Sequence, residues 1–168
     1  ARMARRILQE RAADGTLKPD TIGASVAALV APVKQPEEQK LRSLWALNAI
    51  ATSLRDPQIG KTTMAKEMSF LFADLVDPDV QKPENVVGWA IQLELEDREA
   101  SASFFDSLVK RAKGDSSPGI RLAIASGLQR MPLDKRWPIA EALLAHAEDA
   151  DDHNLPLMYW YGIEPLVA

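Results

Sequence analysis

Apolar residues recur along most of this chain at the spacing that places them on one face of an α-helix. The pattern is clearest in residues 115–166, where three such segments are joined by polar connections that contain proline. Ser117-Pro118 opens the first segment, because serine can cap a helix and proline is tolerated at its first position. The second begins near Asp134 and the third at Asn154. We expect the second helix to bury Ile139, Leu143, Leu144 and Ala147.

The remainder of the chain shows the same period. It predicts a helix with Met3 and Ile7 facing inward over residues 2–13, and a helix that begins at Pro83-Glu84. Four more helices are predicted over residues 21–31, 37–54, 61–75 and 99–113. We find no convincing alternation of apolar and polar residues that would predict a strand. The sequence therefore predicts an all-α protein of about nine helices.

These helices repeat in pairs. Pro36, Pro83, Pro118 and Pro156 each open a helix, at intervals of 47, 35 and 38 residues. Such intervals are typical of HEAT and armadillo repeats. We therefore expect one domain over residues 1–168, an α-α superhelix of four antiparallel pairs preceded by a single N-terminal helix. Because a helix pair needs neighbours to cover its apolar faces, we also expect that this array was excised from a longer protein.

Charge is distributed unevenly. The net charge is −4, yet the last 32 residues contain six acidic side chains and no Lys or Arg. The first helix is basic, with four arginines against one glutamate. Nucleic-acid binding needs clustered basic residues, so we expect no nucleic-acid partner. No apolar run approaches the roughly 20 residues of a membrane helix, so no membrane insertion is expected.

Reactive groups are few. The chain has no cysteine, which excludes disulfides, thiolate metal sites and covalent attachment of a c-type haem. Residues 60–63 end like a phosphate-binding loop, but Arg55 stands where that motif needs glycine, so no nucleotide binding is expected. His146, Asp151, Asp152 and His153 form a weak candidate metal site. The simpler alternative is that Asp152 or Asn154 caps the last helix. We predict no catalytic residue and no cofactor in this chain.

A protein-binding surface is the stronger hypothesis. Aromatic residues are over-represented in binding hot spots, and we place several on the inner, concave layer of helices. At least one ring of the run 159–161 should face outward, whereas Trp45 and Trp89 are better candidates for packing between repeats. Arg121 has the alternative of an inter-repeat contact with an aspartate such as Asp115. The predicted concave-face residues are Arg42, Asn48, Gln92, Arg121, Gln129, Tyr159, Trp160 and Tyr161.

Two resemblances extend this interpretation. Ile120-Arg121, following Asp115 and Pro118, resembles the signature that opens the inner helix of a HEAT repeat. The segment LQRMPLDKRWPIAEALLAHAEDADDHNLPLMYWYGIEPLV resembles the HEAT-repeat region of membrane-bound dehydrogenases and haem-binding-domain proteins of planctomycete and verrucomicrobial bacteria. Weaker matches touch ARRILQERAADGTL, LRSLWALNAI and WAIQLELED. The resemblance implies an upstream propeller-like dehydrogenase domain, a downstream cytochrome c domain and a periplasmic or otherwise extracytoplasmic location. It also implies a histidine where Asn48 stands.

Two functions remain open at this point. The first is a non-catalytic scaffold that binds other domains of its parent chain or a protein partner. The alternative is a HEAT-like DNA-repair glycosylase. The C-terminal helix is apolar on more than one stripe, so we expect the next repeat, or self-association, to cover it. Trp160→Lys or Tyr161→Lys should then weaken self-association without unfolding the chain.

Overall fold

The computed structural model describes residues 2–30, 36–56, 60–61, 63–96 and 100–167, and most of their side chains. Those of residues 2, 19, 55–56, 60–61 and 63–69 are not described. These described parts contain nine α-helices, which confirms the predicted all-α class. The helices are α1 (Arg2–Ala13), α2 (Pro19–Val30), α3 (Glu37–Ser53), α4 (Thr63–Val76), α5 (Glu84–Glu94), α6 (Ala102–Gly114), α7 (Pro118–Leu128), α8 (Leu133–Leu144) and α9 (Leu155–Val167).

Two shorter elements were not predicted. A 3₁₀ helix, η1 (Ala147–Asp151), follows α8. The strands β1 (Arg55–Asp56) and β2 (Gly60–Lys61) form an antiparallel ribbon, with Arg55 opposite Lys61 and Asp56 opposite Gly60. Extended backbone at Asp56 has a local cause, because a residue that precedes proline is disfavoured in the helical region. Because β2 includes Lys61, the helix predicted from about residue 61 begins later, at Thr63.

Local residue chemistry accounts for several helix starts. The Ser117 hydroxyl accepts a hydrogen bond from the Ile120 amide at 3.2 Å, and Pro118 occupies the first position of α7. Ser101 caps α6 in the same way through the Phe104 amide. Proline precedes α3, α5 and α8 in an extended conformation, so the chain enters each helix from a fixed direction.

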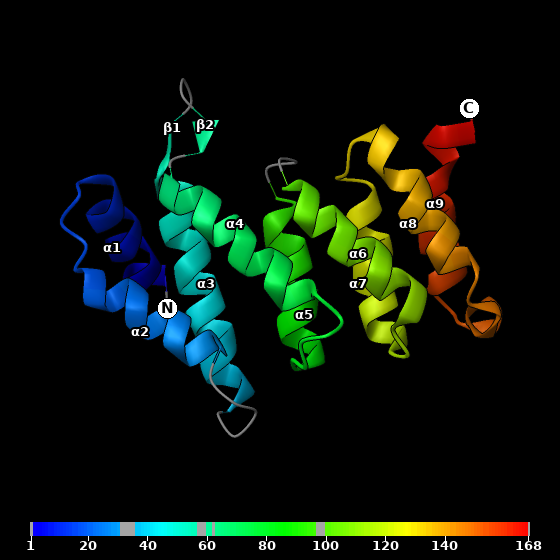
Figure 1. Cartoon of the computed structure of the whole chain (residues 1–168), viewed down its shortest axis with the longest axis horizontal. Coiled ribbons are helices and arrows are strands. Elements are labelled where there is room, and N and C mark those ends of the chain that lie inside the picture. Colours follow the sequence, from blue (N-terminus) through cyan, green and yellow to red (C-terminus); the bar gives the residue numbers. More distant parts are fainter. Residues whose placement is uncertain (1, 31–35, 57–59, 62, 97–99, 168) are drawn as a thin grey trace. The chain divides into compact units, whose positions relative to one another are not determined.

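Unit 1 is one of two compact parts and comprises residues 1–71. Helices α1 and α2 both pack against α3 in this unit (Figure 1). The core is aliphatic and includes Ala12, Leu29, Leu44, Leu47 and Ile50.

Unit 2 comprises residues 72–168 and contains the candidate sites. Helix α7 packs between α5 and α9 in one row, and α6 packs against α8 in a second row (Figure 1). Helix α9 also contacts α8 and η1. It approaches α7 tightly at Gly162, where a Cβ atom would lie 2.9 Å from Leu128 Cβ. The absence of a side chain at residue 162 therefore sets the distance between these two helices.

Four core positions predicted in the first and eighth helices are wrong. Met3 is 70% exposed and Ile7 is also exposed, because α1 turns the opposite stripe, which contains Ala12, toward its neighbours. Leu144 lies off the buried stripe of α8, and Ala147 lies beyond the end of that helix. Both are exposed. Periodicity identified these helices correctly but did not determine the stripe that is covered.

Candidate functional site

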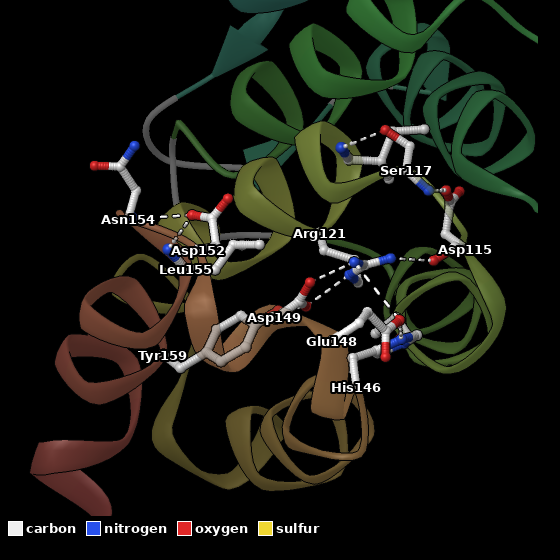
Figure 2. Close-up of polar contacts among 12 residues, drawn as sticks. Asp115, Ser117, Arg121, His146, Glu148, Asp149, Asp152, Asn154, Leu155 and Tyr159 are labelled. Atoms are coloured by element: carbon white, nitrogen blue, oxygen red, sulfur yellow. Dashed lines mark hydrogen bonds and ion pairs between the residues drawn. The ribbon is translucent and has the colours of Figure 1, made fainter.

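A buried cluster of three side chains joins α7, η1 and α9 (Figure 2). Arg121 of α7 donates from Nε to Asp149 Oδ2 at 2.7 Å, and its Nη2 donates to Asp149 Oδ1. The Tyr159 hydroxyl of α9 donates to Asp149 Oδ2 at 2.6 Å. One carboxylate of η1 thus holds donors from both neighbouring helices, and the two-point contact with guanidinium fixes its orientation.

Backbone and side-chain groups extend this cluster. Arg121 Nη1 donates to the Asp115 carbonyl at 2.8 Å, in the connection before α7. His146 places Nε2 at 2.8 Å from the Ala112 carbonyl and Nδ1 at 2.8 Å from Glu148 Oε1. Both ring nitrogens therefore lie within hydrogen-bond distance of oxygen atoms. The chain between α8 and α9 is therefore tied to α6 and to α7.

The charges in this cluster stabilise one another. The hydrogen bonds from Arg121 hold the pKa of the Asp149 carboxyl below its ordinary value. The same contact raises the pKa of Arg121. Burial first, and then the neighbouring Asp149 carboxylate, raises the pKa of the Tyr159 hydroxyl well above its ordinary value. At neutral pH the cluster therefore consists of a guanidinium, a carboxylate and a neutral phenol.

The ion pair of this cluster is buried. The Arg121 and Asp149 side chains are 3% and 4% exposed, so solvent contacts little of either charge. Both Asp149 oxygens accept hydrogen bonds within the protein. Burying two charges costs free energy that is regained only when each is well paired, as here. The cluster positions α9 against α7.

Two more buried arginines were not predicted. Arg111 donates from Nη2 to the Asp77 carbonyl at 2.7 Å and pairs with Asp115 at 2.6 Å. Arg136 donates to the carbonyls of Gln129 and Met131, at 3.0 and 2.9 Å. Each guanidinium supplies donors to carbonyls just beyond the end of a preceding helix, where the helical ladder leaves acceptors unused. The sequence carries one signal for them, an arginine within an otherwise apolar stripe.

The candidate metal residues do not gather into a site. Asp152 accepts hydrogen bonds from the amides of Asn154 and Leu155, at 2.8 and 2.9 Å, and so caps α9, one of the two alternatives predicted. His146 points to Ala112 and Glu148 instead, and Asp151 and His153 are exposed. In the described parts of the chain, no three His, Asp or Glu side chains lie close enough to hold a metal ion.

The predicted concave-face residues separate into buried and exposed groups. Asn48, Arg121 and Tyr159 are buried, so the expectation that these three line an open surface is wrong. Arg121 instead makes the alternative contact near Asp115, although with its carbonyl rather than its carboxylate. Gln92 bridges two helices, donating to Ser126 Oγ at 2.7 Å and to the Ala123 carbonyl at 3.2 Å. Four of the predicted residues are exposed, namely Arg42, Gln129, Trp160 and Tyr161.

An open surface nevertheless runs along the row α5, α7 and α9. A hollow of about 210 Å³ lies over α5 and α7, and Trp89, 45% exposed, lines it. A second hollow of about 450 Å³ lies over α7 and α9 and includes Met158. The two hollows share Gly119 and Ala123. We call this the row surface, and its lining residues are Glu84, Asn85, Gly88, Trp89, Gln92, Gly119, Leu122, Ala123, Ser126, Asn154 and Met158.

The row surface is nearly neutral. Of its lining residues only Glu84 is charged, and its carboxylate accepts a hydrogen bond from the Ser117 hydroxyl at 2.7 Å. The remaining groups are amides, a hydroxyl, small residues and apolar side chains. Sequence reasoning assigned Trp89 to packing between repeats and so missed it as a surface residue.

The side chains of residues 60–63 lie outside the described ones, so the absence of nucleotide binding stays a prediction. Among the described helices, none is long and apolar enough to cross a membrane. Comparison of the chain with protein-family models, curated proteins and solved structures gave no significant match.

Proposed function

We propose that this chain is a non-catalytic, HEAT-like helical-repeat module that binds a segment of a protein partner, or of a neighbouring domain, along the row surface. Its helices are proposed to form antiparallel pairs in a superhelix, which would place α5, α7 and α9 on one continuous face. The resemblance of residues 128–167 to the HEAT-repeat region of bacterial membrane-bound dehydrogenases and haem-binding-domain proteins supports a role between a dehydrogenase domain and a cytochrome c domain outside the cytoplasm.

The observation that carries this proposal is Trp89 at the wall of an open hollow. A tryptophan on a helix face normally packs into the core, yet almost half of this side chain contacts solvent. Tryptophan is among the residues most enriched in binding hot spots. The adjoining hollow over α7 and α9 extends the surface along three helices, which suits an extended segment better than a small molecule.

Peptide selection tests the proposal. A phage library of random peptides, panned against the purified chain, should enrich sequences that bind the row surface. Trp89→Ala should weaken binding of the recovered synthetic peptides at least tenfold, measured by isothermal titration calorimetry, because hot-spot truncations typically reach this magnitude.

Trp137→Ala is the matched control. Trp137 is 50% exposed on α8, but it lines neither hollow. Peptides that bind wild type and Trp137→Ala equally, and Trp89→Ala poorly, would support the row surface. Failure to enrich any peptide, or equal binding to all three proteins, would contradict the proposal.

A further inference from the structure

We propose that copies of this chain associate head to tail, with helix α1 of one copy docked on the exposed apolar face of helix α9 of the next. This inference concerns a different surface from the row surface and does not depend on the proposed function. It rests on the composition, spacing and charge of two helix faces that the structure leaves exposed.

The α9 face consists of Leu157, Trp160, Tyr161 and Glu164. All four are exposed, and Trp160 is 52% exposed. Their spacing of three and four residues places them on one stripe of the helix, opposite the stripe buried against α7. A contiguous group of large apolar side chains on a surface is typical of an interaction site.

The α1 face consists of Met3, Ile7, Glu10 and Arg11, with Arg6 beside it. All of them are exposed. Met3, Ile7 and Arg11 are four residues apart, so they also share one stripe. Arg6 forms an ion pair with Glu10 at 2.7 Å on the edge of this face. Like the α9 face, the α1 face presents apolar side chains followed by charged ones, but here two arginines stand against one glutamate, so the net charge is positive.

Charge selects the pairing of these two faces. Within η1, α9 and the connection between them, the exposed charged side chains are acidic, because no Lys or Arg follows Arg136. Helix α1 carries four arginines against Glu10. Two α9 faces brought together would repel each other, and so would two α1 faces, whereas α1 and α9 attract. The favoured occupant of the α9 face is therefore α1 of a second copy.

Spacing fixes the relative direction. From Met3 to Arg11 is eight residues, or about 12 Å of helix, and from Leu157 to Glu164 is seven, or about 10.5 Å. If the two helices run parallel, the apolar residues meet along the first two turns and Arg11 reaches Glu164. An antiparallel arrangement would place both charges against apolar side chains.

The packing already present supports this pairing. In unit 1, α1 packs against α3, and in unit 2 α5 packs against α7 and α7 against α9. Within each unit these contacts join helices that are two apart in the chain, and α1 of a second copy beside α9 would extend the row α5, α7 and α9 of unit 2. A contact between two different faces is heterologous, so it generates a ring or an open chain of copies rather than a symmetric dimer.

Complementary blocked variants test the inference. Trp160→Lys blocks the α9 face and leaves α1 intact, while Ile7→Asp blocks the α1 face and leaves α9 intact. Wild type should form species that grow with concentration in analytical ultracentrifugation, and each variant alone should associate at least tenfold more weakly. An equimolar mixture of the two variants should form a one-to-one dimer that does not grow further.

Exchange of the two charges provides a second test of the contact. Arg11→Glu should weaken association at low salt, and combining it with Glu164→Arg in one chain should restore it, because exchanged charges still attract. Circular dichroism checks folding, and Trp160→Ala and Ile7→Ala replace any charged variant that unfolds. A monomeric wild type at millimolar concentration would overturn the inference. So would an Ile7→Asp chain that associates as well as wild type, since that result indicates contact between two α9 faces.

Discussion

At Asp149 one carboxylate determines how the last helix joins the rest of unit 2. It lies in η1 and accepts hydrogen bonds from Arg121 of α7 and Tyr159 of α9. Removing a single member of a buried ion pair leaves the other charge without compensation. The three residues should therefore differ sharply in how much their substitution destabilises the fold.

Asp149→Asn should lower the free energy of unfolding by about 3 kcal/mol or more, because Arg121 stays buried without a counter-ion. Tyr159→Phe should cost less, about 1.5–3 kcal/mol, since it removes one hydrogen bond to a charged acceptor and keeps the ion pair. Urea unfolding followed by far-UV circular dichroism at pH 7 measures both values.

Asp149→Asn also tests how the contact between Arg121 and Asp149 depends on pH. Because folding lowers the pKa of Asp149, its contribution to stability is fully present above the ordinary value of 3.8. That contribution is lost as the pH falls through the lower pKa of the folded state. The difference between wild type and Asp149→Asn should therefore shrink as the pH is lowered below 3.8. A difference that stays constant down to pH 2 would contradict the ionised state assigned to Asp149.

The residues of this cluster could be predicted only in part. Arg121 was identified as a candidate for an inter-repeat contact, from its place in a HEAT-like signature. Its true partner is 28 residues away and lies within a run of acidic side chains. Nothing in residues 148–152 indicates which of four carboxylates enters the core. That choice depends on the path of the chain between α8 and α9, which the local sequence does not determine.

Among the elements, the α7–α9 contact depends on a glycine. A methyl group at residue 162 would lie 2.5 Å from Leu128 Cδ1 and 2.9 Å from its Cβ, so the clash cannot be relieved by moving one flexible end. Gly162→Ala should destabilise unit 2 by up to about 2 kcal/mol, because overpacking costs about 1–3 kcal/mol and the gain in helix propensity offsets about 1 kcal/mol of it. Urea unfolding measures the change.

Gly88→Ala is the control for that prediction. A methyl group at residue 88 would lie 3.6 Å from Ala123 Cβ, an ordinary van der Waals distance. This substitution in α5 should be neutral or stabilising by up to about 1 kcal/mol. Equal destabilisation by the two changes would indicate that helix conformation, rather than contact with Leu128, makes residue 162 sensitive.

Helices were the most predictable level of this fold. The apolar period and the proline-containing connections located all nine helices of the described residues to within a few positions. The caps at Ser117 and Asp152 could be predicted from local chemistry. The stripe of each helix that other helices cover could not be predicted, as the exposed Met3 and Leu144 show. A period defines two opposite faces, and only contacts with other helices decide between them.

For the whole molecule, the distribution of charge argues against a polyanionic ligand. The lining of the row surface contains no Lys or Arg, and the last 32 residues are acidic. We therefore expect no binding of a fluorescein-labelled DNA duplex of about 20 bp, even at about 50 mM salt, where phosphate contacts are strongest. Fluorescence anisotropy measures it. Micromolar binding that weakens steeply with salt would favour the repair-glycosylase alternative.

The hydrogen bonds of Arg111 and Arg136 predict which positions of this sequence can change during evolution. Both donate to main-chain carbonyls, which every amino acid supplies. The residues at positions 77, 129 and 131 can therefore be exchanged during evolution without loss of these hydrogen bonds, whereas the two arginines cannot. Among descendants of this sequence, arginine should persist at both positions while the residues that it holds diverge. The hydrogen bonds that these arginines make between helices would then be kept while most of the surrounding sequence changes.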